Sequence, residues 1–275
     1  MNTTNPTSPR DGRVRVDGDL QTVPTAGFSG VPNAHPAPEN GGAGFHSVVS
    51  YIRRSPRMNG SQQASWERNA PRYIVTGLPR ATTASQFTTQ PPLDLVALFG
   101  RDAPLVVEIG VGAGETLTAG ATAWPECDFI GFEVYEKVLG STMSKLAKAE
   151  LNNVRLIAGD AVSGLEHLLP PESIRELWTF FPDPWQKKRH HKRRLVGPAF
   201  AELVLSRLAP GGLWRLATDW DDYATHIHEV LDGHPKLVSV PGARFAVRPM
   251  TRFEARGVAA GRTITDFTYR KVADV

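Results

Sequence analysis

One stretch of this sequence, Phe180 to Leu195, brings together residue types that can carry out chemistry on a polyanion. It reads FFPDPWQKKRHHKRRL, with Asp183 between two prolines, then Trp185, then a block of cations and histidines at 187–194. The prolines restrict the backbone around the carboxylate, and cations bind phosphates. The block can also be interpreted as a solvated loop or a localisation tract. The block lies in the middle of the chain, beside Asp183, and this position favours a binding surface.

A second candidate site begins at Glu108, where an apolar run enters a glycine-rich turn. The sequence LVVEIGVGAGET has glycines at Gly110, Gly112 and Gly114, and glycines let backbone amides approach a ligand closely. A dinucleotide-binding turn would carry its third glycine at position 115, which is Glu115. Because that carboxylate would repel a pyrophosphate, the turn favours a ligand without phosphates over NAD.

Acidic residues at three successive predicted strand ends narrow the ligand further. Glu133 ends FIGFE, where a carboxylate can accept both hydroxyls of a ribose. Asp160, with the neighbouring amide of Ala161, can meet an adenine edge, and Glu108 can hold the ammonium of an amino acid. Taken singly, each acid is better explained as a helix cap or a surface charge. Taken together with the glycine turn, they predict S-adenosylmethionine as the cofactor.

These residues require a sheet whose strand ends meet at one edge. From Leu93 onward, apolar runs alternate with amphipathic stretches, including a helix from Val196 to Leu208 that ends at Pro210-Gly211-Gly212. We predict an α/β fold with a doubly wound, mostly parallel, seven-stranded sheet whose last strand is antiparallel, with a loop joining the last two strands. The predicted strands are Leu105–Ile109, Asp128–Phe132, Val154–Ala158, Leu177–Phe181, Leu213–Ala217, Phe245–Arg248 and Ile264–Arg270.

Asp183 and Asp219 both end predicted strands and are therefore expected at the same crevice as the acids of the cofactor site. Asp219 lies in LATDWDDY, just before a predicted helix. A helix cap is a second explanation for that residue.

The N-terminal part of the chain has a different composition. Residues 1–45 are rich in Pro, Gly, Asn and Thr, and such a segment buries too little apolar surface to fold, so we predict a disordered tail. Residues 46–92 are predicted to form a basic arm, with a short strand or turn at 48–52 and a helix from Gln62 to Asn69 that ends before Pro71. Its arginines and aromatic residues fit phosphate contacts and ordinary packing equally well. The catalytic domain is predicted at 93–275.

Composition excludes several classes of protein. The chain has 275 residues, 41% hydrophobic residues, a formal net charge of +3 and one cysteine, Cys127, which rules out an internal disulfide and suits a reducing compartment. No run reaches transmembrane length and no signal-peptide pattern begins the chain, so a cytoplasmic protein that binds no membrane is expected. No Cys/His cluster predicts a metal, because His190 and His191 are adjacent and belong to the basic block.

FPDPWQKKRHHKRRL resembles the signature of the bacterial tRNA (guanine-N7-)-methyltransferase family. VVEIGVGAGE, FIGFEV, NVRLIAGDA, LAPGG, ATDWDDYA and RPMTRFEARG resemble that family's other blocks, in its order. The similarity runs from about His46 to Arg270. It implies the Rossmann-like fold of class I methyltransferases, with tRNA as substrate, methylation at guanine 46 of the variable loop, and no obligatory protein partner, as a monomer or homodimer.

The resemblance also implies residue roles. Glu108, Glu133 and Asp160 match cofactor contacts, and Asp183 matches a cofactor-pocket position that is proposed to be catalytic. Substrate-binding positions of the family are matched by Lys187, Asp219, Thr251, Arg252, Phe253 and Glu254, and its RNA-contacting stretch by Arg189, His190, His191, Lys192, Arg193 and Arg194.

Guanine N7 carries a lone pair and no proton, so its methylation needs no obligatory general base. Catalysis can rest on positioning and on a carboxylate near the migrating positive charge, a role we assign to Asp183 with Glu254 or Asp219 as a second acceptor. Three alternatives remain open at this point. They are a methyltransferase of another RNA, of a small molecule or of a protein; a non-catalytic RNA-binding protein; and a nicotinamide dehydrogenase, which Glu115 opposes.

Overall fold

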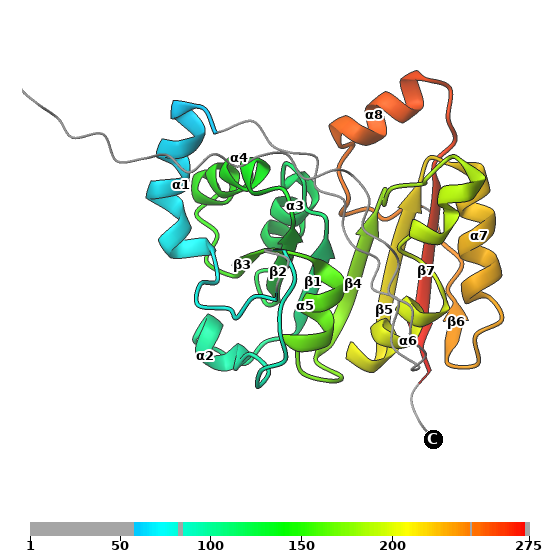
Figure 1. The fold of residues 1–275 in the computed structure, drawn as a ribbon, viewed down its shortest axis with the longest axis horizontal. Coiled ribbons are helices and arrows are strands. Elements are labelled where there is room, and N and C mark those ends of the chain that lie inside the picture. The colour runs from blue at the N-terminus through cyan, green and yellow to red at the C-terminus, as the bar shows by residue number, and fades with distance from the viewer. Residues whose placement is uncertain (1–57, 82–84, 243, 273–275) are drawn as a thin grey trace, which may run out of the picture. The chain divides into compact units, whose positions relative to one another are not determined.

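The computed structural model describes residues 58–81, 85–242 and 244–272. The predicted tail at 1–45 and the predicted strand or turn at 48–52 lie outside these residues. The described part is built on one seven-stranded sheet with the strand order β3-β2-β1-β4-β5-β7-β6, covered by helices on both faces (Figure 1).

The sheet is doubly wound and mostly parallel, as predicted. Strands β1 to β5 pair in parallel, β7 is antiparallel to β5, and β6 is antiparallel to β7. The chain starts at β1, moves outward through β2 to β3, and returns to place β4 on the other side of β1. The strands are β1 (Leu105–Ile109), β2 (Asp128–Glu133), β3 (Val154–Ala158), β4 (Ile174–Phe180), β5 (Leu208–Thr218), β6 (Leu237–Ser239) and β7 (Thr265–Lys271).

Successive residues of the central strands pack against opposite helical layers, because side chains alternate across a strand. Val106 belongs to a core with Leu117, whereas Val107 belongs to a second core with Leu165 and Phe200. One layer contains α1 (Gly60–Tyr73), α3 (Glu115–Ala123) and α4 (Glu136–Lys148); the other contains α2 (Leu95–Phe99), α5 (Ala161–His167), α6 (Pro198–Arg207) and α7 (Asp221–Leu231).

The strand predicted at Phe245–Arg248 is wrong; the sixth strand is β6, and a helix, α8 (Arg252–Ala259), replaces the predicted loop before β7. Phe245 instead inserts into an aromatic cluster, with its ring centroid 5.3 Å from that of Trp178. Arg248 is fully buried and donates to both carboxylate oxygens of Asp266 at 2.8 Å. These two side chains pack between secondary-structure elements. Alternating buried residues in a loop give the same sequence pattern as a strand, so the pattern alone cannot tell them apart.

Helix α1 continues through Pro71 to Tyr73, so its predicted end before Pro71 is wrong. A reciprocal capping box between Asn59 and Gln62 starts the helix. Its last turn is held by tertiary contacts, because the buried Tyr73 donates its hydroxyl to the carbonyl of Leu151 at 3.0 Å. These contacts offset the hydrogen bond that a proline cannot make.

Strand β5 begins at Leu208, earlier than the predicted Leu213, so the Pro-Gly-Gly segment lies within the strand rather than before it. The pairing of β4 with β5 is irregular between Ile174 and Glu176. A Cβ at Gly212 would lie 2.8 Å from the carbonyl oxygen of Ala209 and 3.0 Å from that of Ile174. The glycine therefore serves a close backbone approach inside the sheet. Within the described residues, no helix has the length and apolar character needed to cross a bilayer.

Candidate active site

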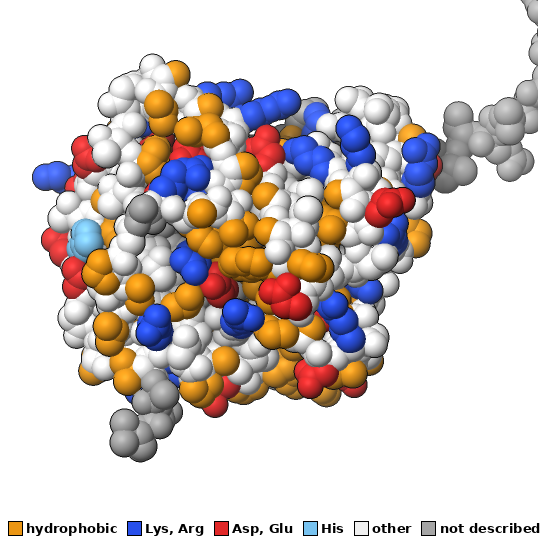
Figure 2. All heavy atoms as spheres, turned by 180° about the vertical axis from the view of Figure 1, so that it is seen from behind, with side chains coloured by type: hydrophobic (Ala, Val, Ile, Leu, Met, Phe, Trp, Pro, Cys, Tyr) orange, Lys and Arg blue, Asp and Glu red, His pale blue; other side chains and the backbone are white. Residues whose placement is uncertain are grey.

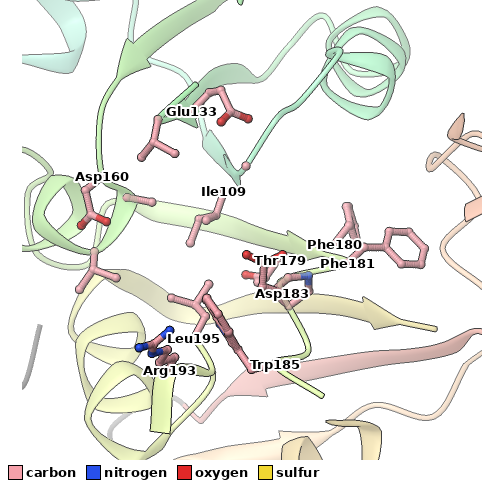
Figure 3. A pocket seen from close by; sticks show the side chains of 15 residues that line it. Ile109, Glu133, Asp160, Thr179, Phe180, Phe181, Asp183, Trp185, Arg193 and Leu195 are labelled. Atoms are coloured by element: carbon pink, nitrogen blue, oxygen red, sulfur yellow. The ribbon is translucent and has the colours of Figure 1, made fainter. Parts of the chain in front are cut away.

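A pocket of about 310 Å³ opens where β1, β2, β3 and β4 end. This is the place where the strand order reverses between β1 and β4, and ligands of doubly wound sheets bind at such a point. Figure 3 shows Glu133 and Asp160 on one side of the pocket, and Trp185 and Arg193 on the other. The predicted site residues that line it are Gly110, Glu133, Asp160, Ala161, Asp183 and Arg193.

The three glycines of the turn after β1 have different surroundings. Gly110 lines the pocket with φ of 73°, and a Cβ there would meet no atom within 4 Å, which leaves room for a ligand. At Gly114, a Cβ would lie 2.4 Å from Cγ2 of Thr142. That glycine is therefore required by the packing of α3 against α4. Gly112 contributes its amide, which donates to Glu133.

Glu133 at the end of β2 is held by backbone amides. Its Oε2 accepts from the amide of Gly112 and its Oε1 from that of Tyr135, both at 2.9 Å. Burial raises the pKa of the Glu133 carboxyl, while these hydrogen bonds act to lower it. Each carboxylate oxygen has a second lone pair, so Glu133 is oriented and still able to accept hydroxyl hydrogens from the pocket.

Glu108 lies on β1 behind the glycine turn and is only 4% exposed. Its Oε2 is buried without a hydrogen-bond partner in the described residues. Burial, together with the charge of Glu133, raises the pKa of Glu108 well above its usual range. A buried acceptor without a donor needs an explanation. An ammonium group of a ligand would provide one, which fits the amino-acid part of S-adenosylmethionine.

Asp160 both caps a helix and lines the pocket. Its Oδ1 accepts from the amide of Ser163 at 2.9 Å and so caps α5. Its own amide donates to the carbonyl of Ser85 at 2.6 Å, which ties the N-terminal arm to this pocket. Asp160 and Ala161 also line the pocket, so the cap fixes a residue that a ligand can reach.

Asp183 lies in a loop with unusual backbone geometry. Phe181 and Trp185, on either side of the Pro-Asp-Pro sequence, both have positive φ values of 52° and 47°. Side chains larger than glycine seldom adopt this conformation, and such strain concentrates at functional sites. The amide of Phe181 donates to the carbonyl of Ala217 at 2.8 Å, which anchors the loop to β5. Asp183 is exposed and lines the pocket.

The basic stretch, residues 187–194, continues directly from this loop. Lys188–Arg193 form the 3₁₀ helix η1, and Arg193 stacks its guanidinium 5.1 Å from the ring centroid of Trp185. Partial burial, with the charges of Arg193, Arg189 and Lys187, lowers the pKa of His190. Lys and Arg side chains also appear along the upper edge of the face in Figure 2. The exposed cations of the stretch are Lys187, Lys188, Arg189 and Lys192.

Arg194 differs from the rest of the stretch, because its side chain is only 2% exposed and pairs with the carboxylate of Asp222. Its Nε donates to the carbonyl of Pro184 at 2.9 Å. The side chain of Arg194, which is predicted to contact RNA, therefore points into the protein, where its N–H groups donate to protein acceptors.

The predicted substrate carboxylates lie outside the pocket lining and are bound to arginines. Asp219 accepts from Nε of Arg262 at 2.7 Å. It makes no cap for α7, whose first turn has no side-chain cap. Glu254 on α8 is 1% exposed and accepts from two nitrogens of Arg244, both at 3.0 Å. Sequence reasoning missed Arg244 and Arg262, because no spacing signal links partners 10 and 43 residues apart.

The other predicted substrate residues begin α8. Thr251 caps the helix by accepting the amide of Glu254 at 3.1 Å. Arg252 is exposed, and its amide approaches the Glu115 carboxylate at 3.3 Å. Phe253 is half exposed, and its ring centroid lies 5.5 Å from that of Phe181. The start of α8 therefore lies against the loop that carries Asp183.

Within the described ranges, no group of three or more His, Cys, Asp or Glu side chains is arranged to hold a metal ion.

This chain is similar in sequence to known methyltransferases. A family described as "Putative methyltransferase" (Methyltransf_4) matches residues 102–267. The chain is 54% identical over 231 residues to the tRNA (guanine-N(7)-)-methyltransferase of Cutibacterium acnes, covering 82% of this chain and 83% of that protein. It is 46% identical to the protein of the same name from Nocardioides sp., covering 84% of this chain and 90% of that protein.

A third relative with this name, from Nitrosomonas europaea, is 42% identical over 229 residues, covering 82% of this chain and 97% of that protein. Among solved structures, the 16S rRNA methyltransferase KamB is similar with a TM-score of 0.48 and 14% identity, over 66% of this chain and 95% of that one. Because the sequence similarity extends over most of this chain and of its relatives, the chain belongs to the tRNA (guanine-N(7)-)-methyltransferase family.

Proposed function

We propose that this chain transfers a methyl group from S-adenosylmethionine to N7 of a guanine in tRNA, at position 46 of the variable loop. One observation carries the proposal beyond the family's name. Asp183 lines the same pocket as Glu133 and Asp160, and its loop leads directly into the basic stretch. The segment from Asp183 to Arg194 therefore connects the pocket of the proposed cofactor to a surface that can bind phosphates.

In this proposal the residues at and directly behind the ends of β1 to β3 divide the cofactor among them. Glu133 accepts the ribose hydroxyls, Asp160 and Ala161 meet the adenine, and Glu108 accepts from the ammonium group. Gly110 leaves the open space beside the turn, and Gly112 and Gly114 shape it. The pocket volume of about 310 Å³ is at the lower end of the range for small-ligand sites.

S-adenosylmethionine supplies a methyl group activated by its sulfonium. A bond forms between guanine N7 and the methyl carbon as the carbon–sulfur bond breaks, and that electron pair stays on sulfur. The positive charge therefore moves to the guanine ring, and no proton leaves N7. Asp183 orients the guanine by accepting from its N–H edge and stabilises the ring as it becomes positive.

The remaining predicted residues act on the acceptor side. Lys187, Asp219 and the segment Thr251–Glu254 bind the substrate nucleotide, and the outward residues of the basic stretch bind the tRNA backbone. We infer that residues 46–92 are an arm attached to a methyltransferase domain at 93–275. We also infer that the enzyme works in the cytoplasm as a monomer or homodimer without an obligatory protein partner.

The test is nucleoside mass analysis of tRNA from cells that lack this protein. We expect 7-methylguanosine to disappear from tRNAs that carry guanine 46, and to return when the protein is supplied. A tRNA transcript with adenine at position 46 is the matched substrate control in vitro and should accept no methyl group. Retention of all 7-methylguanosine in the deletion strain would refute the proposal, and methylation of the control transcript would refute the assigned position.

A further inference from the structure

Arg194 belongs to the basic stretch by sequence but makes its contacts inside the protein. Its side chain is 2% exposed, whereas Lys188 and Arg189 are exposed. Its Nη2 donates to the carboxylate of Asp222 on α7 and lies 3.2 Å from Nε2 of His191. The guanidinium also lies over the buried ring of Tyr223, 4.9 Å from its centroid.

Nη1 of Arg194 donates to the backbone carbonyl of Asp222 at 3.5 Å, and a further donor of the guanidinium reaches the loop that carries Asp183. Nε of Arg194 donates to the carbonyl oxygen of Pro184 at 2.9 Å. That carbonyl belongs to the peptide between Pro184 and Trp185, and Trp185 has the unfavourable φ of 47°. A residue keeps such a conformation only when surrounding contacts hold it. A charge-assisted hydrogen bond from a buried guanidinium is a contact of the required strength.

We infer that Arg194 is a positioning residue for the Asp183 loop rather than a contact for RNA. It links three elements: the Pro184–Trp185 peptide, η1 through His191, and α7 through Asp222. A second hydrogen bond joins the segment after Arg194 to α7: the Tyr223 hydroxyl accepts from the amide of Val196 at 3.1 Å. The inference rests on the proposed function of the Asp183 loop in methyl transfer.

The alternative, a phosphate contact, would require Arg194 to give up these partners. Moving the guanidinium outward would leave the Pro184 carbonyl without this donor and would leave His191, 3.6 Å away, as the neighbour of the Asp222 carboxylate. An unmade buried hydrogen bond is costly. Arg193, the preceding residue, lies beside Trp185 and lines the pocket instead, so adjacent arginines are assigned different roles.

The substitution Arg194→Lys separates the two roles, because it keeps a positive charge that can contact phosphate. Lysine lacks the planar fork that reaches Pro184 and Asp222 together. We expect Arg194→Lys to lower kcat roughly 10- to 100-fold, with the KM for tRNA and the salt dependence of binding within about twofold of wild type. Arg207→Lys is the control for kcat, because Arg207 also donates to backbone carbonyls, those of Leu165 and Glu166, but lies at the end of α6 and does not line the pocket. It should retain more than about half of kcat. A raised KM with unchanged kcat in Arg194→Lys would overturn the inference.

Hydrogen exchange over residues 181–188 gives a second measurement that does not depend on methyl transfer. Faster exchange in this segment is expected for Arg194→Lys and, to a smaller extent, for Asp222→Asn, and not for Arg207→Lys. Thermal unfolding and binding of S-adenosylhomocysteine check that each variant is folded. Unchanged exchange in Arg194→Lys would overturn the positioning role. Failure of the wild-type protein to methylate tRNA would instead reject the proposed function, and the exchange result would still decide the role of Arg194.

Discussion

The two halves of the candidate site hold their carboxylates in different ways. In the donor half, at the ends of β1 to β3, Glu133 is held by backbone amides, and Glu108 keeps an oxygen that no described residue contacts by a hydrogen bond. In the acceptor half, near α8, Asp219 and Glu254 are bound to arginine side chains. Amides orient a carboxylate and leave it able to accept from a ligand, whereas an arginine occupies and neutralises it.

This difference indicates how the two substrates are received. The donor half is already arranged for a ligand with hydroxyl and ammonium donors. In the acceptor half, Asp219 has to leave Arg262 before it can accept from a base, and Glu254 has to leave Arg244 and the buried Arg248, which lies 3.5 Å away. Arg244 and Arg262 are each a little over one-third exposed, so both can move outward. We therefore expect the donor half to be preformed and the acceptor half to rearrange when tRNA binds.

The sharpest test of the comparison is at Asp183, where the two halves meet. Asp183→Ala should reduce kcat for tRNA methylation roughly 1,000-fold, about 4 kcal/mol, because a carboxylate near the developing charge is removed. Binding of tRNA should remain within about threefold of wild type, because the basic stretch is retained. Steady-state kinetics and filter binding measure the two quantities.

Asp102→Ala is the matched control for that experiment. Asp102 is exposed and precedes β1, at the opposite edge of the sheet from the pocket. Its removal should leave both quantities unchanged. Full turnover by Asp183→Ala would contradict the role assigned to Asp183.

A second test breaks the acceptor half. Glu254→Ala removes a buried carboxylate and leaves Arg244 and Arg248 without that partner. Breaking a buried ion pair on one side is strongly destabilising, so we expect a loss of about 3 kcal/mol in the free energy of unfolding. Urea denaturation measures the loss. The affinity for S-adenosylmethionine should be unchanged, and a loss below about 1 kcal/mol would mean that this pair is not a structural element.

A third test addresses the donor half, and here the substitution is expected to increase the free energy of unfolding. Glu108→Gln should stabilise the unliganded protein by about 1 kcal/mol at pH 7, because an unpaired buried carboxylate is replaced by a neutral group. The raised pKa of Glu108 means that the folded protein holds this proton more tightly than the unfolded chain. The wild-type carboxylate therefore costs stability as the pH rises above about 4.5. The gain from the substitution should consequently disappear near pH 4.

Urea denaturation with and without S-adenosylhomocysteine completes the third test. The ligand should stabilise wild type more than Glu108→Gln, because the variant loses the carboxylate that is proposed to pair with the ammonium group. Equal stabilisation of both proteins by the ligand would show that Glu108 makes no such contact.

The smallest predicted effect concerns the outward cations. Arg189→Ala should weaken tRNA binding and reduce the slope of log K against log salt concentration by about 1. Lys148→Ala, at the exposed end of α4, is a matched loss of one charge far from the pocket and should leave the slope unchanged. Equal slopes for wild type and Arg189→Ala would indicate that this part of the basic stretch makes no phosphate contact.

Much of the fold follows from local sequence patterns. The strands predicted at Leu105–Ile109 and Val154–Ala158 have the same bounds in the structure. The sequence pattern locates them well because buried parallel strands are continuous apolar runs between turn residues. The same reasoning misplaced Phe245–Arg248 as a strand. There, Phe245 and Arg248 are buried by tertiary contacts with Trp178 and Asp266, and alternation alone does not reveal such contacts.

The sequence by itself determined where the groups of the candidate site lie along the chain: the glycine turn, the acids at strand ends, and the Asp183 loop that leads into the basic stretch. Residue type and order suffice for these features, because parallel strands bring their carboxyl ends to one edge. Only the tertiary structure decided which charges remain available. Arg194 is engaged by Pro184 and Asp222, and Glu254 by Arg244. Burial and pairing between distant segments set those states, and no local pattern in the chain encodes them.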